Sequence, residues 1–147
     1  MEPFQQIFIQ VIEDMIPFNK FLGFQLEEIK EGFARIRVPF RPEFIGDPRN
    51  NRLHGGLSAT LIDTVGGAAA LTTLTSYDDQ IATIDMRVDY LKPGKAEDLI
   101  AEGKILRSGN RIVVCEMKVY QPSSDEIIAA GKAVYNVIRK NTKQESN

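Results

Sequence analysis

The chain has 147 residues, of which 43% are hydrophobic and 26% charged, and these values are ordinary for one soluble globular domain. Eighteen basic and 20 acidic residues give a net charge of −2, which excludes the general basic surface of a nucleic-acid-binding protein. The lone Cys115, an N-terminus without a signal-peptide pattern and the lack of an apolar run of about 20 residues predict a cytoplasmic protein that does not span a membrane.

The first predicted element is an amphipathic helix over Phe4–Phe18. Its apolar residues Ile7, Val11, Ile12 and Met15 recur at helical spacing, and Pro17 is expected to end it. We interpret this helix as one that packs over a sheet. A lid over a substrate site is the alternative interpretation.

A hairpin and a loop are predicted next. Gly23–Glu31 and Gly32–Phe40 alternate apolar and polar residues, and Lys30–Gly32 has the composition of the turn between two strands. Arg41–Leu53 contains two prolines and a glycine and has no hydrophobic period, so it predicts an irregular loop. At about 13 residues, it has the length at which loops tend to be functional.

A long helix is predicted from Leu57 to Leu74. One apolar face contains Leu57, Leu61, Ala68 and Leu71. Asp63 lies on another face, whose remaining members are all small: Gly56, Ala59, Thr60, Gly66, Gly67 and Ala70. Because glycine inside a helix costs about 1 kcal/mol relative to alanine, this face predicts close packing or a ligand beside the acid.

The start of this helix carries the only histidine, His54, followed by Gly55 and Gly56. The first turn of a helix has N–H groups without partners and a partial positive charge, and glycine leaves those groups open to an oxyanion. Asp63 lies about two turns further on, roughly 10–12 Å along the axis. A second, antiparallel copy of the helix across a two-fold axis would bring donor and acid to one atom.

Four strands are predicted after the helix, over Gln80–Leu91, Asp98–Leu106, Arg111–Gln121 and Glu126–Arg139. Strict alternation in the first strand places Thr83 on the same face as Asp85 and Arg87. Lys140–Asn147 is predicted to be a frayed polar tail. The order of elements predicts an α+β domain in which a single antiparallel sheet wraps a long central helix. The edges of such a sheet predict pairing between two copies.

Two segments carry a resemblance to a known family. They are His54-Gly55-Gly56 followed after six residues by Asp63, and Ile84–Gly94, which reads IDMRVDYLKPG. Together they resemble the hotdog-fold acyl-CoA thioesterases, most closely the phenylacetate-type (PaaI-like) subgroup of the 4-hydroxybenzoyl-CoA thioesterase superfamily. The resemblance implies one hotdog domain over residues 1–147, an acyl-CoA substrate, and no cofactor or metal. It also implies a homodimer, or a dimer of dimers, with active sites at the subunit interface.

The resemblance also implies roles for individual residues. Asp63 is the nucleophile or the general base for water, the Gly55 N–H polarises the thioester carbonyl, His54 shapes the helix start, and Thr83 assists the water. A polar residue of the preceding loop assists too, for which Asp47 ranks above Asn51 and Asn50 is also near. The residues implied in substrate or coenzyme A binding are Gly56, Tyr90, Lys92, Lys95, Arg107, Ser108, Gly109, Asn110 and Arg111, whose cations suit phosphates.

Other interpretations of these residues stay open. Asp63 can be an acid bonded to Thr60 or exposed at a helix end, and His54 can be a capping or core residue. One histidine and one cysteine make a zinc site a poor interpretation. A nucleophilic Ser58 lacks the Gly-x-Ser-x-Gly elbow, and Thr83 can simply face solvent. For the whole chain, the alternatives are a non-catalytic acyl-CoA-binding or regulatory hotdog domain, and a hotdog dehydratase, whose catalytic histidine lies in a different motif.

Overall fold

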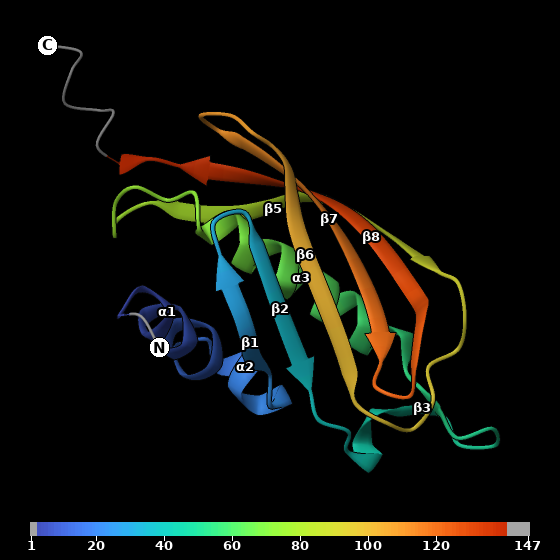
Figure 1. Ribbon diagram of the computed structural model, residues 1–147. Helices are drawn as coiled ribbons and strands as arrows, with labels where there is room; N and C mark the ends of the chain where they lie inside the picture. The colour runs from blue at the N-terminus through green and yellow to red at the C-terminus, as the bar shows by residue number, and fades with distance from the viewer. Residues whose placement is uncertain (1–2, 141–147) are drawn as a thin grey trace, which may run out of the picture.

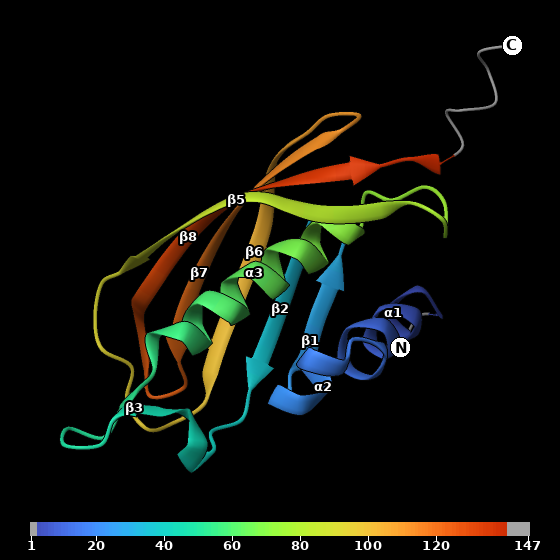
Figure 2. The same ribbon diagram turned by 180° about the vertical axis from the view of Figure 1, so that it is seen from behind.

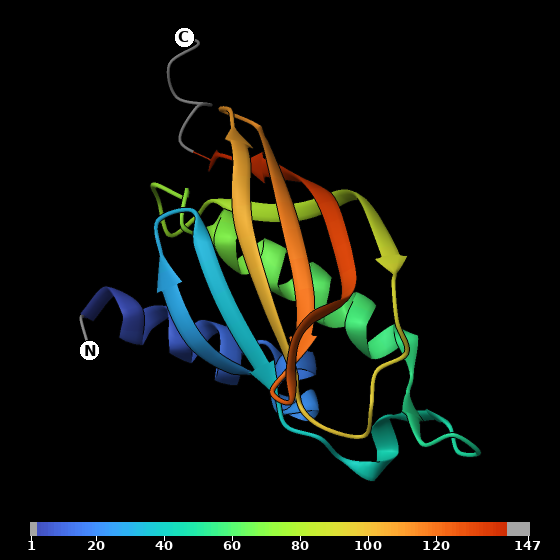
Figure 3. The same cartoon turned by 45° about the vertical axis from the view of Figure 1, so that its right-hand side comes forward.

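The computed structural model describes residues 3–140, and its centre is one helix that lies across one sheet (Figure 1). The six-stranded sheet has the order β1-β2-β6-β7-β8-β5, with every neighbouring pair antiparallel. Its strands are β1 (Gln25–Lys30), β2 (Phe33–Val38), β5 (Gln80–Tyr90), β6 (Leu99–Ser108), β7 (Ile112–Gln121) and β8 (Ser124–Ile138). The sheet curves around the helix α3 (Gly55–Leu71), as Figure 3 shows. The predicted α+β hotdog arrangement is confirmed.

Burial of α3 reaches further around the helix than the predicted apolar face. Leu57, Leu61 and Ala68 are buried as expected. The helix also buries Ser58, Ile62, Val65, Gly66, Ala69 and Ala70. A helix that is apolar around most of its circumference is covered on most sides, and the inner face of the sheet supplies most of this cover. Of residues 3–140, no helix combines the length and the apolar character needed to cross a bilayer.

The ends of α3 differ from the prediction of Leu57–Leu74. The helix begins two residues earlier because the His54 side chain caps it by accepting a hydrogen bond from the Gly56 N–H. It ends at Leu71, where the hydroxyls of Thr72 and Thr73 donate to the carbonyls of Ala69 and Ala70. The Thr72 and Thr73 N–H groups donate to the same two carbonyls, so both acceptors at this helix end are satisfied.

The N-terminal region forms three short helices, not one. They are α1 (Pro3–Ile9), the π-helix η1 (Gln10–Met15) and α2 (Pro17–Leu22). The expectation that Pro17 ends the first helical run is confirmed, because η1 stops at Met15 and Ile16, directly before the proline, is extended. Pro17 is also the first residue of α2, a position where its missing N–H costs nothing, and Gly23, with a φ of 78°, ends α2. In Figure 2, α3 runs between β5 above and these helices below.

The segment predicted as an irregular loop contains regular structure. It forms the 3-10 helix η2 (Pro42–Phe44) and a small hairpin of β3 (Ile45–Asp47) and β4 (Arg52–Leu53). Strands of three and two residues are too short to show an alternating pattern in sequence. The hairpin leads into α3, and the His54 N–H donates to the Phe44 carbonyl at 2.8 Å.

The remaining strands are confirmed with small shifts at their ends. The turn between β1 and β2 lies at Glu31–Gly32, as predicted. The predicted strand Asp98–Leu106 continues two residues further, because Arg107 and Ser108 belong to the end of β6, past a bulge between Ile105 and Arg107. The predicted tail lies outside the described residues, apart from Lys140.

Candidate active site

Asp63 lies two turns into α3, half-buried, and contacts side chains from two strands. The Thr83 hydroxyl of β5 donates to Asp63 Oδ1 at 2.9 Å. The Tyr135 phenol of β8 donates to the Asp63 carbonyl at 2.8 Å and lies 3.4 Å from Oδ1. The alternative that Thr60 holds the acid is wrong, because the Thr60 hydroxyl donates to the Gly56 carbonyl. One carboxylate oxygen, Oδ1, is therefore held, and no residue within 3–140 bonds Oδ2.

Thr83 reaches Asp63 because β5 is not a regular strand. Thr83 pairs with Tyr135 and Asp85 pairs with Val134, so Ile84 is an extra residue in a β-bulge. A bulge shifts the alternation of side chains by one position. Met86 and Val88 face the core after the bulge, and Thr83 still faces α3 before it. Strict alternation, which grouped Thr83 with Asp85, was wrong here, and the side chain does not simply face solvent.

Tyr135 was missed by sequence reasoning. It is 1% exposed, and its pKa is raised far above the ordinary value by burial and by the negative charge of Asp63. The phenol is thus neutral and acts as a hydrogen-bond donor. A signal was available, since Tyr135 alternates with the buried Ala133 and Val137 and a buried phenol needs a polar partner.

The glycine at position 66 gives Tyr135 its place against α3. A Cβ at position 66 would lie 2.5 Å from the Tyr135 phenol oxygen and 2.9 Å from Met117 Sδ. Both distances are far below van der Waals contact. This close approach is one reason for glycine beside the acid, and it offsets the cost of glycine within the helix.

A cavity of about 280 Å³ opens beside Asp63. Its walls come from three parts of the chain. They are the N-terminal helices and their linker with Ile12, Ile16 and Asn19, α3 with Asp63, Thr64, Gly67, Ala68 and Leu71, and the strands with Ile81, Thr83 and Tyr135. Five of these residues are aliphatic, and the polar ones are Asn19, Asp63, Thr64 and Thr83. The N-terminal region thus forms part of the wall beside the acid.

The start of α3 leaves one backbone donor open. The Gly56 N–H donates to His54 Nδ1 at 2.8 Å, and the Leu57 N–H donates to the His54 carbonyl at 3.1 Å. For the Gly55 N–H, no partner exists among residues 3–140. Tyr90 lies against this turn and donates its phenol proton to the Gly55 carbonyl at 2.8 Å. A second cavity, of about 300 Å³, borders Gly55 and Tyr90.

We expect His54→Ala to lower the free energy of unfolding by about 1 kcal/mol, because it removes the N-cap of α3. His54→Asn is the matched control, since asparagine is a good N-cap and restores an acceptor for the Gly56 N–H. Urea unfolding of the three proteins measures the difference. Equal stability of His54→Ala and wild type would mean that the cap contributes nothing.

The predicted loop residues close the β3–β4 turn. Asp47 Oδ1 accepts hydrogen bonds from the Arg49 and Asn50 N–H groups, and Oδ2 accepts one from the Asn50 side chain at 2.9 Å. That side-chain bond lowers the pKa of Asp47. Asn51 has a φ of 54°, in the left-handed region. Within one chain, none of these three side chains forms a hydrogen bond with Asp63.

The residues implied in coenzyme A binding form two groups. Tyr90 and Lys92 line the cavity at the start of α3, where Lys92 forms an ion pair with Glu126, and Lys95 pairs with Arg52 of β4 just before this helix. The second group is Arg107, Ser108, Gly109, Asn110 and Arg111, all exposed at the β6–β7 end. Figure 1 places the β6–β7 turn at the far end of the sheet from the start of α3. One chain does not bring the two groups together.

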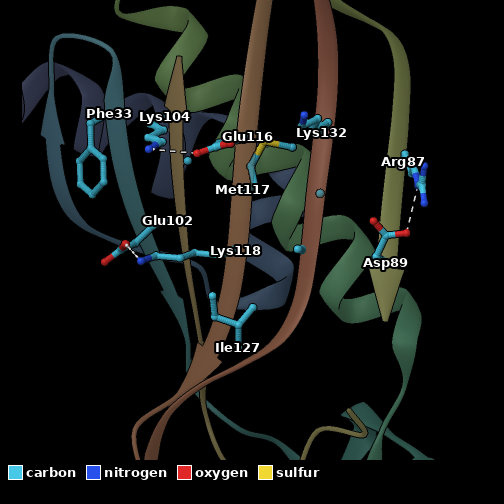
Figure 4. Close-up of a pocket in the computed structure, with 13 residues that line it drawn as sticks. Phe33, Arg87, Asp89, Glu102, Lys104, Glu116, Met117, Lys118, Ile127 and Lys132 are labelled. Atoms are coloured by element: carbon cyan, nitrogen blue, oxygen red, sulfur yellow. Dashed lines mark hydrogen bonds and ion pairs between the residues drawn. The ribbon is translucent and has the colours of Figure 1, made fainter. Parts of the chain in front are cut away.

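Two other features lie apart from Asp63. A hollow of about 520 Å³ lies on the outer face of the sheet, where charged side chains pair with each other, as in Lys104–Glu116 and Glu102–Lys118 (Figure 4).

Burial raises the pKa of the Cys115 thiol to about 12, so the thiol is neutral and unsuited to nucleophilic chemistry. No group of His, Cys, Asp or Glu side chains that could hold a metal occurs between residues 3 and 140.

Comparison with known proteins points to one family. A sequence profile described as the thioesterase superfamily matches residues 50–128. The chain is 32% identical over 134 residues to YigI of Escherichia coli K12, a medium/long-chain acyl-CoA thioesterase, and the match covers 83% of this chain and 86% of that protein. A crystal structure from Shewanella oneidensis, related to the thioesterase superfamily, has 31% identity and a TM-score of 0.81 over 94% of this chain and 100% of that one. A Haemophilus influenzae thioesterase, with 17% identity, a TM-score of 0.77 and coverage of 95% and 92%, supports the fold alone.

Proposed function

Because the chain belongs to the thioesterase superfamily, we propose that it hydrolyses acyl-CoA thioesters to the free acid and coenzyme A. The observation that carries this proposal is the hydrogen bond from Thr83 to Asp63, beside a cavity whose walls include five aliphatic side chains. A carboxylate held in a fixed orientation beside an apolar pocket suits attack on an acyl group bound there. The name of the Escherichia coli relative supports the same substrate class.

Asp63 Oδ2 is the oxygen that acts in this proposal, because Oδ1 is held by Thr83 and lies near Tyr135. As a general base, Asp63 takes a proton from water, and the water oxygen bonds the thioester carbon. As a nucleophile, Oδ2 bonds the carbon itself, and water then cleaves the resulting anhydride. In both routes the C–S bond breaks, coenzyme A leaves as the thiolate and takes up a proton, and the acid is released.

We assign the developing oxyanion to the Gly55 N–H, the open donor at the positive end of the α3 dipole. This donor and Asp63 are eight residues apart on one helix, about 12 Å along the axis. A single carbonyl cannot contact both within one chain. We therefore propose a homodimer in which Gly55 of one subunit meets Asp63 of the other, twice per dimer.

The edge strand β5 is the surface that we propose for dimer formation. Ile84 in the middle of β5, Tyr90 at its end and Leu91 just after it are apolar and stay exposed in the single chain, at 57%, 55% and 58%. Unprotected strand edges pair with other chains, and pairing at β5 places two copies of α3 side by side. Two such dimers would form the dimer of dimers that the PaaI-like resemblance implies. The proposed setting is one catalytic domain in the cytoplasm, where Cys115 stays reduced.

The test of the proposed function is turnover of acyl-CoA by the purified protein, followed with a reagent that reports free thiols. Hydrolysis with multiple turnovers supports a thioesterase. Tight binding of acyl-CoA without release of coenzyme A supports the alternative, a non-catalytic acyl-CoA-binding domain. Calorimetry with a non-hydrolysable thioether analogue measures binding in both cases.

We expect the double variant Arg107→Ala, Arg111→Ala to raise KM for acyl-CoA about tenfold. Charge-assisted bonds to the nucleotide phosphates would be lost while the chemistry is spared. With an acyl thioester that lacks the nucleotide, KM should stay within about twofold. Lys104→Ala with Lys132→Ala, which removes two cations from the outer sheet face, is the matched control. Equal effects on both substrates would assign the arginines to structure.

A further inference from the structure

The cavity beside Asp63 has a direction along α3. Asp63, Gly67 and Leu71 line it at intervals of four residues, which is one side of the helix. On β5, the Thr83 hydroxyl bonds Asp63. Ile81, which also lines the cavity, lies two residues nearer the N-terminal end of the strand. The cavity therefore has the acid at one end and two branched apolar side chains, Leu71 and Ile81, towards the other.

We propose that this cavity binds an aliphatic acyl chain of about eight to ten carbons, with its carbonyl at Asp63 and its methyl end at Leu71. This inference rests on the proposed thioesterase function and names its substrate class. From Asp63 to Leu71 the helix rises about 12 Å. A C–C bond of about 1.5 Å with an angle of about 111° advances an extended chain by about 1.25 Å per carbon. The length thus suits a medium-length chain.

The volume gives a similar size by a separate route. A cavity of about 150 Å³ holds a benzene ring, which has six carbons. The cavity here, about 280 Å³, therefore holds roughly ten carbons. Its elongated lining, two helical turns from acid to end wall, favours a chain over a compact ring. Ile12 and Ile16 from the N-terminal region provide the apolar wall on the third side.

Gly67 is the residue that distinguishes this cavity from ordinary packing. A Cβ at position 67 would meet only the Tyr135 ring, at 3.7 Å, which is ordinary contact. Packing therefore does not demand glycine at position 67, in contrast to position 66. Yet glycine within a helix costs about 1 kcal/mol relative to alanine. We infer that glycine at position 67 leaves room for the acyl chain, which passes through the space that a side chain there would fill.

Chain length should control turnover in a measurable way. Each methylene moved from water into an apolar site contributes about 0.8 kcal/mol, or roughly fourfold in kcat/KM. The wild-type enzyme should gain about this factor per carbon from butyryl-CoA to octanoyl-CoA. The gain should stop near ten carbons, where the chain meets Leu71.

Two variants with opposite effects test the proposal. Gly67→Leu places a side chain one turn, about 6 Å, beyond Asp63, so the ratio of kcat/KM for octanoyl-CoA over butyryl-CoA should fall at least tenfold. Leu71→Ala opens the far end, so the ratio for dodecanoyl-CoA over octanoyl-CoA should rise about fourfold or more. Ile127→Ala, which removes an aliphatic side chain from the outer sheet face, should change neither ratio.

The outcomes separate the inference from the function on which it rests. Wild-type protein that turns over no acyl-CoA of any length contradicts the proposed function and the inference together. Turnover whose length profile stays the same in Leu71→Ala and Gly67→Leu overturns the inference alone. If Gly67→Leu does not fold, Leu71→Ala decides the question by itself, because it only removes atoms from a half-buried site.

Discussion

Asp63→Asn is expected to lower kcat by about 10²–10⁴-fold, the usual contribution of a general acid or base. The asparagine side chain is nearly isosteric, and its oxygen can still accept the hydrogen bond from Thr83. The Tyr135 bond to the backbone carbonyl at this position is also kept. Loss of turnover would therefore report the missing carboxylate and not a disturbed fold. Steady-state kinetics with octanoyl-CoA and a free-thiol reagent provide the measurement.

Asp85→Asn is the matched control for this variant. Asp85 lies on the same strand as Thr83, past the bulge, and is exposed. It should keep wild-type kcat within about twofold, because asparagine has nearly the size of aspartate and leaves the backbone of β5 unchanged for pairing. Urea unfolding confirms that both variants are folded. Near wild-type kcat in Asp63→Asn would remove Asp63 from the chemistry.

Mixing two inactive variants is expected to restore about a quarter of wild-type activity, by the symmetry of a two-fold dimer. One parent carries Asp63→Ala and the other Gly55→Pro, which deletes the proposed oxyanion donor. Gly55 is the first residue of α3, where proline is well accepted. Co-refolding equal amounts makes about half of the dimers mixed, and each mixed dimer has one site with both defects and one site with neither.

Gly55→Ala is the control for the proline variant. Any Cβ at position 55 lies 3.1 Å from the Tyr90 ring, so both substitutions require the same small shift of Tyr90. Alanine keeps the N–H, and we expect Gly55→Ala to retain most of the turnover that proline abolishes. Subunit exchange is followed with differently tagged chains. If exchange occurs and the mixture stays as inactive as its parents, both groups act within one chain.

Periodic segments were the part of this molecule that sequence could predict. The helix around Asp63 and the four strands after it have patterns of ten or more residues, long enough for the period to be unambiguous. Gly55 was singled out because helix starts have a defined set of open donors. The structure keeps that donor open and places an N-cap on the neighbouring one.

Single-residue irregularities and distant contacts were not predictable in the same way. The extra residue Ile84 puts Thr83 on the opposite face of the sheet from Asp85. Nothing in an alternating pattern marks where such an extra residue occurs. Tyr135 is 72 positions from Asp63, so their contact follows only from the order of strands. The hairpin before His54 depends on bonds within a short turn that has no period at all.

The π-helix η1, through Ile12, and the strand β5, through Thr83 beside its bulge, both contribute to the walls of the same cavity. Each is a regular element with one residue added, and both kinds of irregularity are frequent at functional sites. Among relatives, a gap of one residue within Gln10–Met15 or at Ile84 would restore a regular helix or strand and reshape the wall. Substrate preference in such proteins would then diverge through insertions and deletions, even where every aligned side chain is identical.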